Sequence, residues 1–208
     1  MLERGFHIVS CDGAGLFGSP RAVAIGDVFY ADLVERLGTA DLRLLLYHFP
    51  EMSGAVLTAE LVQDLRRRFG PVIDGLKDST GALDQTLGLI RALPELRVLV
   101  GTEVHLPAAI AAGGAGTICG LANVVPELVR ALTEAEDPKA IQALVSRMDG
   151  LEALFGDVPF VVALKAMLAS ETGAADWVRP LPPLEAMDAA EADRLKRALR
   201  AWRSDAAG

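Results

Sequence analysis

The sequence predicts an α/β protein built around a parallel β-sheet. Apolar runs of strand length alternate with helical patterns five times, and no run shows the strict alternation of a half-exposed antiparallel strand. The 208 residues suffice for one domain, or at most two. Of these residues, 51% are hydrophobic and 23% are charged, which excludes a disordered or collagen-like chain. We therefore expect a sheet buried on both faces.

The expected strands and helices alternate through the first two thirds of the chain. Apolar runs predict strands at residues 7–11, 42–49, 72–76, 96–100 and 115–119. Helical spacing of apolar residues predicts helices at 20–37, 58–69, 82–93, 106–112 and 125–135. Thr58 stands where the second of these helices begins, and its hydroxyl is suited to cap the helix.

The last third of the sequence changes character after Pro138. Helices are predicted at 139–155, 159–171 and 189–202, with a proline-rich connector at 179–183 between the last two. We therefore expect a body of residues 1–136 and a C-terminal helical extension of residues 137–208.

Charge and cysteine content exclude several classes of function. The net charge is −8 and no basic run exceeds Arg66–Arg68, so we expect no nucleic-acid partner. Cys11 and Cys119 lie in apolar runs without a CxxC spacing, which favours a reducing cytoplasm over a disulfide framework. The three histidines show no metal-ligand spacing, so we expect no metal, and no cofactor is indicated.

Targeting and membrane segments are not expected either. The N-terminus lacks a basic region followed by an apolar one. Residues 104–126 carry no charged side chain, but their glycines, Pro107 and Asn123 favour a buried helix, turn and strand over a membrane span.

Two α/β folds compete for this pattern. Gly13–Gly18 fits the G-x-G-x-x-G of a dinucleotide-binding fold, but no acidic residue ends the next strand at the ribose position. Polar clusters directly follow four apolar strands, as expected of a (β/α)8 barrel, whose functional residues lie at the C-terminal strand ends. These clusters are Tyr47–Pro50, Lys77–Gly81, Gly101–Glu103 and Gly116–Ile118. We therefore favour the barrel.

Lys77 and Tyr47 are the predicted catalytic residues. Of four lysines, only Lys77 ends an apolar strand rather than lying in a helical pattern. A lysine held in such a pocket can form a Schiff base with a ketone, although an ion pair with Asp78 or Glu103 explains it equally well. Tyr47 ends the preceding strand, where its phenol can transfer protons. His48 should point to the opposite face and serve a structural role.

These motifs together resemble the dihydrodipicolinate synthase / N-acetylneuraminate lyase family. The resemblance rests on Tyr47-x-x-Pro50, on Gly75-Leu76-Lys77-Asp78-Ser79, on Gly113-x-x-Gly116-x-Ile118 and on residues 178–184, and it runs from about Arg4 to Trp202. It implies a (β/α)8 TIM barrel with three C-terminal helices, a homotetramer, and class I aldolase chemistry on pyruvate or a related 2-oxo acid. It also implies a Schiff base on Lys77 and proton transfer by Tyr47.

The resemblance suggests substrate contacts, and departures from it narrow the reaction. The wall that contacts the pyruvyl group matches Gly116–Ile118, and we add Ser79 and Thr102 as candidate substrate-binding residues. Met52 replaces the arginine typical of the lysine-biosynthesis branch, which favours cleavage of a sugar acid or hydroxy-oxo acid over dihydrodipicolinate synthesis.

The family's Gly-Thr-Thr-Gly-Glu motif, which binds the substrate carboxylate, does not occur in this sequence. We therefore expect an N-terminally incomplete barrel of about five βα units. The alternative function is a catalytically silent barrel fragment that acts only as an assembly partner. In such a fragment we expect Leu44, Leu46, Val98 and Val100 to meet water in part.

Overall fold

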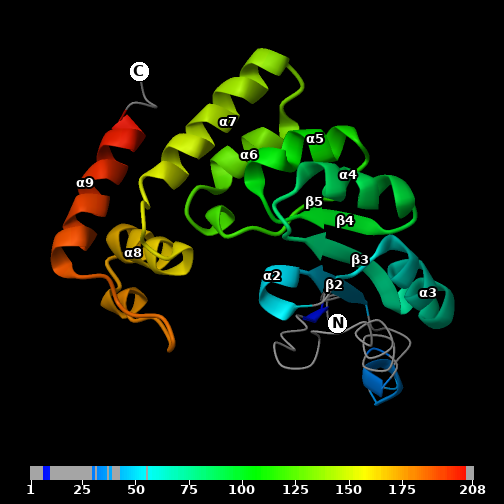
Figure 1. Ribbon diagram of the computed structural model, residues 1–208. Helices are drawn as coiled ribbons and strands as arrows, with labels where there is room; N and C mark the ends of the chain where they lie inside the picture. The colour runs from blue at the N-terminus through cyan, green and yellow to red at the C-terminus, as the bar shows by residue number, and fades with distance from the viewer. Residues whose placement is uncertain are drawn as a thin grey trace, which may run out of the picture. The chain divides into compact units, whose positions relative to one another are not determined.

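The structure is a computed structural model that describes residues 43–54 and 56–204, with short pieces at 7–9, 30, 32–36 and 38. Its contacts divide the chain into two compact units, Met1–Ile118 and Cys119–Gly208 (Figure 1). This division falls earlier than the expected boundary at residues 136 and 137. The reason is that α6 (Pro126–Glu134) packs against α7 (Pro138–Ala153) and therefore belongs with the later helices.

The first unit contains five parallel strands that lie side by side in sequence order. They are β1 (His7–Val9), β2 (Leu44–His48), β3 (Ile73–Asp78), β4 (Arg97–Val100) and β5 (Gly116–Thr117). All five predicted strands are confirmed, and Figure 1 shows β2 to β5 stacked in this order. Strand β3 continues two residues beyond its predicted end at Leu76, so Lys77 lies within the strand.

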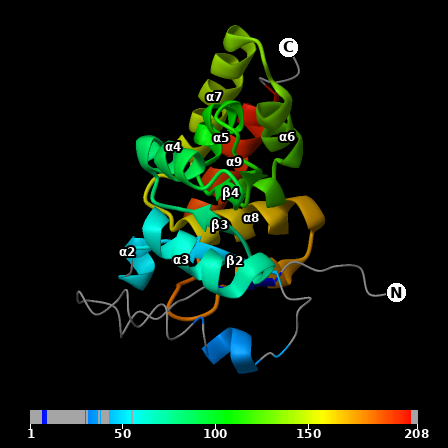
Figure 2. The same cartoon turned by 90° about the vertical axis from the view of Figure 1, so that its right-hand side faces the viewer.

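Helices cover one face of this sheet. The helices α3 (Ala59–Phe69), α4 (Leu83–Ala92) and α5 (Leu106–Ala111) pack beside β3, β4 and β5 (Figure 2). The side chains on the helix-covered face are buried: Leu44, Leu46, Leu76, Val98 and Val100.

The opposite face is less enclosed, because Tyr47, Lys77 and Leu99 are only half-buried. The expectation that both faces are buried therefore holds for the apolar side chains of the helix-covered face and only in part for the opposite face, where Leu45 and Ile73 are also buried. The expectation that Leu44, Leu46, Val98 and Val100 meet water is wrong, because alternation along the strands turns these side chains toward the helices.

The connections between the strands follow from local sequence. The Thr58 hydroxyl accepts a hydrogen bond from the Leu61 amide and caps α3, as predicted. A short helix that was not predicted, α2 (Pro50–Ser53), begins at the proline that follows β2. Two 3-10 turns, η1 (Gly70–Val72) and η2 (Glu103–His105), lie directly before β3 and after β4.

The charge-free stretch 104–126 is not a single long helix. It forms α5, a turn at residues 112–113 and β5, in the expected order, and a 3-10 turn, η3 (Leu121–Asn123), follows. Among the described residues, no helix is long and apolar enough to cross a membrane. Of the predicted helix 20–37, the structure describes only Tyr30 and residues 32–36, which are helical. The G-x-G-x-x-G segment and Cys11 lie outside the described residues.

The described part of the second unit is helical. After η3 and α6 come α7, α8 (Phe160–Thr172), η4 (Ala175–Val178) and α9 (Ala189–Ser204), close to the predicted ranges. Its core consists of apolar side chains such as Leu132, Met148 and Leu151, each fully buried. The Phe160 ring lies so close to Gly120 that no larger residue fits there without movement.

Candidate active site

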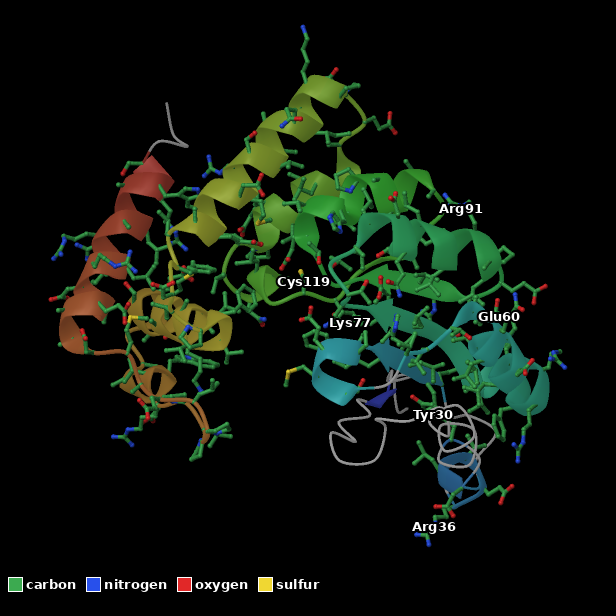
Figure 3. The ribbon with its side chains drawn as sticks, in the orientation of Figure 1. Tyr30, Arg36, Glu60, Lys77, Arg91 and Cys119 are labelled. Atoms are coloured by element: carbon green, nitrogen blue, oxygen red, sulfur yellow. The ribbon has the colours of Figure 1, made fainter. Side chains whose placement is uncertain are left out.

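Lys77 and Tyr47 meet across adjacent strands. They are register partners on β3 and β2, and both side chains are half-buried on the face away from the helices. Lys77 Nζ lies 3.2 Å from the Tyr47 hydroxyl and 4.4 Å from the centre of the Tyr47 ring. Figure 3 shows Lys77 beside β3. The predicted pair is therefore in hydrogen-bonding contact.

The structure decides against the ion-paired alternative for Lys77. Asp78 follows Lys77 in the same strand, so its side chain points to the helix-covered face, where it contacts His48 and Thr86. Within the described part of the chain, Lys77 forms no ion pair with Asp78 or Glu103. No ion pair with either of these two carboxylates therefore explains the position of the Lys77 amine.

A second polar cluster lies on the helix-covered face, directly behind the lysine–tyrosine pair. His48 and Asp78 are fully buried, and His48 Nδ1 lies 3.1 Å from Asp78 Oδ1. The other carboxylate oxygen accepts hydrogen bonds from the hydroxyls of Thr86 and Thr80. The Thr80 amide, 3.3 Å from Oδ1, completes the surroundings of this carboxylate. His48 thus points away from Tyr47, as predicted.

Two ionisable groups in this region have shifted pKa values. Burial raises the pKa of Asp78, but the polar groups of His48, Thr86 and Thr80 around it outweigh burial and hold the pKa below its usual value. Burial lowers the pKa of His105, and the negative charge of Asp78 opposes this shift only in part. The structure therefore favours a charged Asp78 and a neutral His105.

The four predicted substrate-binding residues lie at the ends of three neighbouring strands. Ser79 and Thr102 come after β3 and β4, Gly116 lies in β5, and Ile118 follows it. Ser79 and Ile118 continue the sheet ladder, since their amides donate to His48 O at 2.8 Å and Val100 O at 3.2 Å. The four residues are all half-buried.

Two glycines leave room at these strand ends. The Ser79 hydroxyl lies where a side chain on Gly101 would stand, so Ser79 requires glycine at that position. Gly116 has φ +132°, a value that glycine adopts without strain.

In the described part of the chain, no three His, Cys, Asp or Glu side chains gather closely enough to hold a metal.

The sequence matches the model of the Dihydrodipicolinate synthetase family over residues 29–202. The chain belongs to this family. A similar protein is the "Uncharacterized DapA-like lyase" of Chloroflexus aurantiacus, which is 32% identical over 144 residues, or 69% of this chain and 46% of the relative. The chain thus spans about half the length of this relative.

Solved structures of the dihydrodipicolinate synthase type share the fold. YagE from E. coli K12, solved in complex with pyruvate, aligns with TM-score 0.75 at 23% identity and covers 90% of this chain and 64% of its own. The 2-keto-3-deoxygluconate aldolase of Sulfolobus in complex with D-KDPG aligns with TM-score 0.76 at 19% identity, over 90% of this chain and 62% of its own. These likenesses place the sheet among TIM-barrel proteins.

The sequence predicts the lysine–tyrosine pair but not the contact between His48 and Asp78 behind it. From the sequence, His48 is expected to be structural and Asp78 to be a possible partner of Lys77. Their mutual contact follows from the alternation of side chains on two strands whose register pairs Tyr47 with Lys77. The spacing of thirty residues that links Tyr47 to Lys77 also links His48 to Asp78.

Proposed function

We propose that this chain carries out class I aldolase or lyase chemistry on pyruvate or a related 2-oxo acid. The observation that carries the proposal is the 3.2 Å contact between Lys77 Nζ and the Tyr47 hydroxyl, across paired strands at their C-terminal ends. Membership of the Dihydrodipicolinate synthetase family supports it. Pyruvate, the ligand named for YagE, is the natural first probe.

The contact suits the steps of imine formation. The amine of Lys77 bonds to the carbonyl carbon of the 2-oxo acid, and the carbonyl oxygen takes up protons and leaves as water. The Tyr47 hydroxyl lies close enough to hand a proton to that oxygen and to take one from the nitrogen. Ser79, Thr102, Gly116 and Ile118 line the neighbouring strand ends, where we place the substrate.

Met52, a residue outside the lysine–tyrosine pair, bears on the substrate class. Met52 lies in α2, directly after β2, and its side chain is 60% exposed. A thioether offers no positive charge to a second carboxylate, unlike the arginine of the lysine-biosynthesis branch. We therefore favour cleavage of a sugar acid or hydroxy-oxo acid over dihydrodipicolinate synthesis.

The proposal extends to architecture and assembly. We propose that the five parallel strands correspond to part of a (β/α)8 barrel and that α7, α8 and α9 form its C-terminal extension. We expect a homotetramer, as the family resemblance implies, and a cytoplasmic location, as the cysteine content favours. A stable monomer at micromolar concentration, seen by light scattering, would contradict the assembly but leave the chemistry open to its own test.

Borohydride trapping tests the chemistry. With pyruvate present, borohydride should fix an adduct on the peptide that contains Lys77, and Lys77→Ala should abolish it. Lys139→Ala on α7 is the matched control, because Lys139 is exposed and lies in the other unit. Tyr47→Phe keeps the ring but removes the hydroxyl, so trapping should slow. A failure to trap any adduct on Lys77 would contradict the proposal and favour the silent assembly partner.

Adduct formation and turnover should differ in strength. The sequence contains no Thr-Thr pair to bind the substrate carboxylate. One well-placed donor to such an anion contributes about 2.7–4 kcal/mol in a transition state. We therefore expect these 208 residues to give a weak adduct and little C–C cleavage, and robust cleavage would show that other groups bind the carboxylate.

A further inference from the structure

Two cross-strand pairs lie back to back at the ends of β2 and β3. Tyr47 is the register partner of Lys77, and His48 is the register partner of Asp78. Because side chains alternate along a strand, the first pair occupies one face of the sheet and the second pair the other. Any shift of β2 along β3 therefore moves both pairs together.

The carboxylate of Asp78 joins three elements of the first unit. It contacts His48 on β2, accepts hydrogen bonds from the amide and hydroxyl of Thr80 in the loop after β3, and accepts another from Thr86 on α4. His48, Asp78 and Thr86 are all at most 2% exposed. Lys77 directly precedes Asp78 in β3. The contacts of Asp78 with β2, the loop after β3 and α4 therefore fix the position of the strand end that carries the Lys77 amine.

Stability alone does not account for the buried polar cluster around the Asp78 carboxylate. Well-packed apolar side chains of similar volume are often equally stabilising or better, because burying a carboxylate has a large desolvation cost. What a polar cluster adds is direction, since each hydrogen bond fixes the position of its partners. This one lies where catalytic side chains of a barrel are placed, at the C-terminal strand ends.

We infer that His48 and Asp78 are positioning residues that hold Lys77 against Tyr47 for imine formation. The inference rests on the proposed function and adds to it the source of the site's geometry. A displacement of about 1 Å between reacting groups can slow a reaction about a hundredfold. The two residues touch no substrate, because they face the helices; they act through the separation of β2 and β3.

The test compares variants that keep or remove the contact. His48→Asn keeps a polar amide near the position of Nδ1, which lies 3.1 Å from Asp78 Oδ1, and removes the rest of the ring. Neither ring nitrogen makes a well-aligned hydrogen bond in the described part of the chain, so His48 meets Asp78 through a close polar contact. His48→Leu fills the space without a donor, and Asp78→Asn removes the charge. Leu65→Ala is the stability control, because Leu65 is fully buried on α3 and contributes no polar group to the cluster.

Two quantities are measured: the rate constant of trapping at saturating pyruvate, and the pyruvate concentration that gives half of this rate constant. Both are measured well below the midpoint temperature of unfolding of each variant. We expect His48→Leu and Asp78→Asn to lower the rate constant about tenfold or more while the half-saturating concentration changes little. His48→Asn should recover most of the rate, and Leu65→Ala should leave it unchanged. Equal rates in wild type and His48→Leu, or equal losses in His48→Leu and Leu65→Ala, would overturn the inference.

A second measurement separates this inference from the proposed function. If the wild-type chain traps no pyruvate, the proposed function fails, and reductive methylation with formaldehyde and cyanoborohydride then tests the positioning alone. Lys139 in the same molecule is the internal reference. Loss of the His48 contact should free the amine from Tyr47 and speed methylation of Lys77 several-fold relative to Lys139. An unchanged ratio would overturn the inference by itself.

Discussion

The two compact units bury different kinds of side chain. Among the described residues, every buried polar or charged side chain lies in the sheet unit, Met1–Ile118: His48, Ser53, Asp78, Thr86 and Glu103. The described core of the helical unit, Cys119–Gly208, is apolar throughout. Burying a polar group costs free energy unless it is hydrogen-bonded. The sheet unit carries this cost at the strand ends that also hold Lys77 and Tyr47.

Exposed ion pairs occur in both units and do not distinguish them. Arg130 pairs with Glu134 and Arg179 with Asp176 in the helical unit, and Arg36 pairs with Asp32 and Arg67 with Asp64 in the sheet unit, all through side chains that lie largely in water. Pairs of this kind stabilise by no more than about 1 kcal/mol. The comparison teaches that the helical unit is held by apolar packing, whereas the sheet unit combines packing with a directed polar network next to its reactive groups.

Aromatic residues allow each unit to be observed separately. Both tryptophans, Trp177 and Trp202, lie in the helical unit, and both tyrosines, Tyr30 and Tyr47, lie in the sheet unit. Tryptophan fluorescence therefore follows the helical unit, and hydrogen exchange of β2 and β3 follows the sheet unit.

Core truncations should have the largest effect. Leu46→Ala in the sheet unit and Leu132→Ala in the helical unit each remove a side chain with no exposed surface, so each should lower the free energy of unfolding by about 2–5 kcal/mol. In urea, Leu132→Ala should shift the tryptophan transition, and Leu46→Ala should chiefly speed exchange in β2 and β3. Equal shifts of the tryptophan transition in both variants would show that the units unfold as one.

Glycine substitutions should separate backbone from side-chain crowding. A Cβ at Gly75 would overlap the backbone carbonyl of Arg97 on β4, whereas one at Gly120 would meet the side chains of Phe160 and Leu164. Backbone cannot turn aside, so Gly75→Ala should lower the free energy of unfolding by about 1–3 kcal/mol or more, and Gly120→Ala by less.

Gly88→Ala is the control for these two variants. Gly88 lies within α4 with open space around it, so alanine there should raise the free energy of unfolding by up to about 1 kcal/mol. Thermal unfolding of the three glycine variants measures the order of their stabilities. A milder effect at Gly75 than at Gly120 would contradict the close approach of β3 and β4.

Acid should weaken the sheet unit through Asp78 and His105. Both pKa values are lowered in the folded chain, so the unfolded chain binds more protons as the pH falls. Each contribution is therefore present above the group's ordinary pKa and is lost as the pH falls through the lowered folded value. His105 acts first, below about pH 6.5, and Asp78 follows below about pH 3.9.

Hydrogen exchange of β2 and β3 between neutral and acid pH measures this loss. Asp78→Asn removes one titrating group, so its stability should depend less on pH at the acid end, although its stability at neutral pH should be lower. The tryptophan signal of the helical unit provides the reference. An Asp78→Asn chain with the same steep acid dependence as wild type would contradict the lowered pKa of Asp78.

The order of the strands could be predicted because each apolar run is bounded by polar or glycine-rich residues. Which face of the sheet the helices cover could not be predicted, so Leu46 and Val100 are expected to meet water but are buried on the face that α3 to α5 cover. The end of β3 was also misjudged, because Lys77 and Asp78 are charged residues in a strand that tertiary contacts extend.

The candidate site was predicted in part. The position of Lys77 after an apolar run and of Tyr47 one strand earlier indicated both residues, and alternation placed His48 on the other face. Their 3.2 Å contact depends on the register of β2 and β3, which the sequence alone does not specify. The contact between His48 and Asp78 depends on the same register, so the sequence alone indicates Asp78 only as a neighbour of Lys77.

The smallest predicted effect concerns one helix cap in each unit. The Thr58 hydroxyl accepts from Leu61 N at 3.3 Å on α3, and the Asp137 carboxylate accepts from Ala140 N at 2.9 Å on α7. Replacing either residue by alanine should lower the free energy of unfolding by about 1 kcal/mol. Asp137→Ala should have the larger effect, because its hydrogen bond is shorter and its charge also favours the helix N-terminus.

Asp137→Asn separates these two contributions, since it keeps an acceptor and removes the charge. Its loss should be smaller than that of Asp137→Ala and should shrink further in high salt, which screens the exposed charge but not the hydrogen bond. Urea unfolding followed by tryptophan fluorescence gives the free energy of unfolding of the wild type, Asp137→Ala and Asp137→Asn. If Asp137→Asn were as unstable as Asp137→Ala at every salt concentration, the cap hydrogen bond would contribute nothing, and apolar packing alone would hold α7 in place.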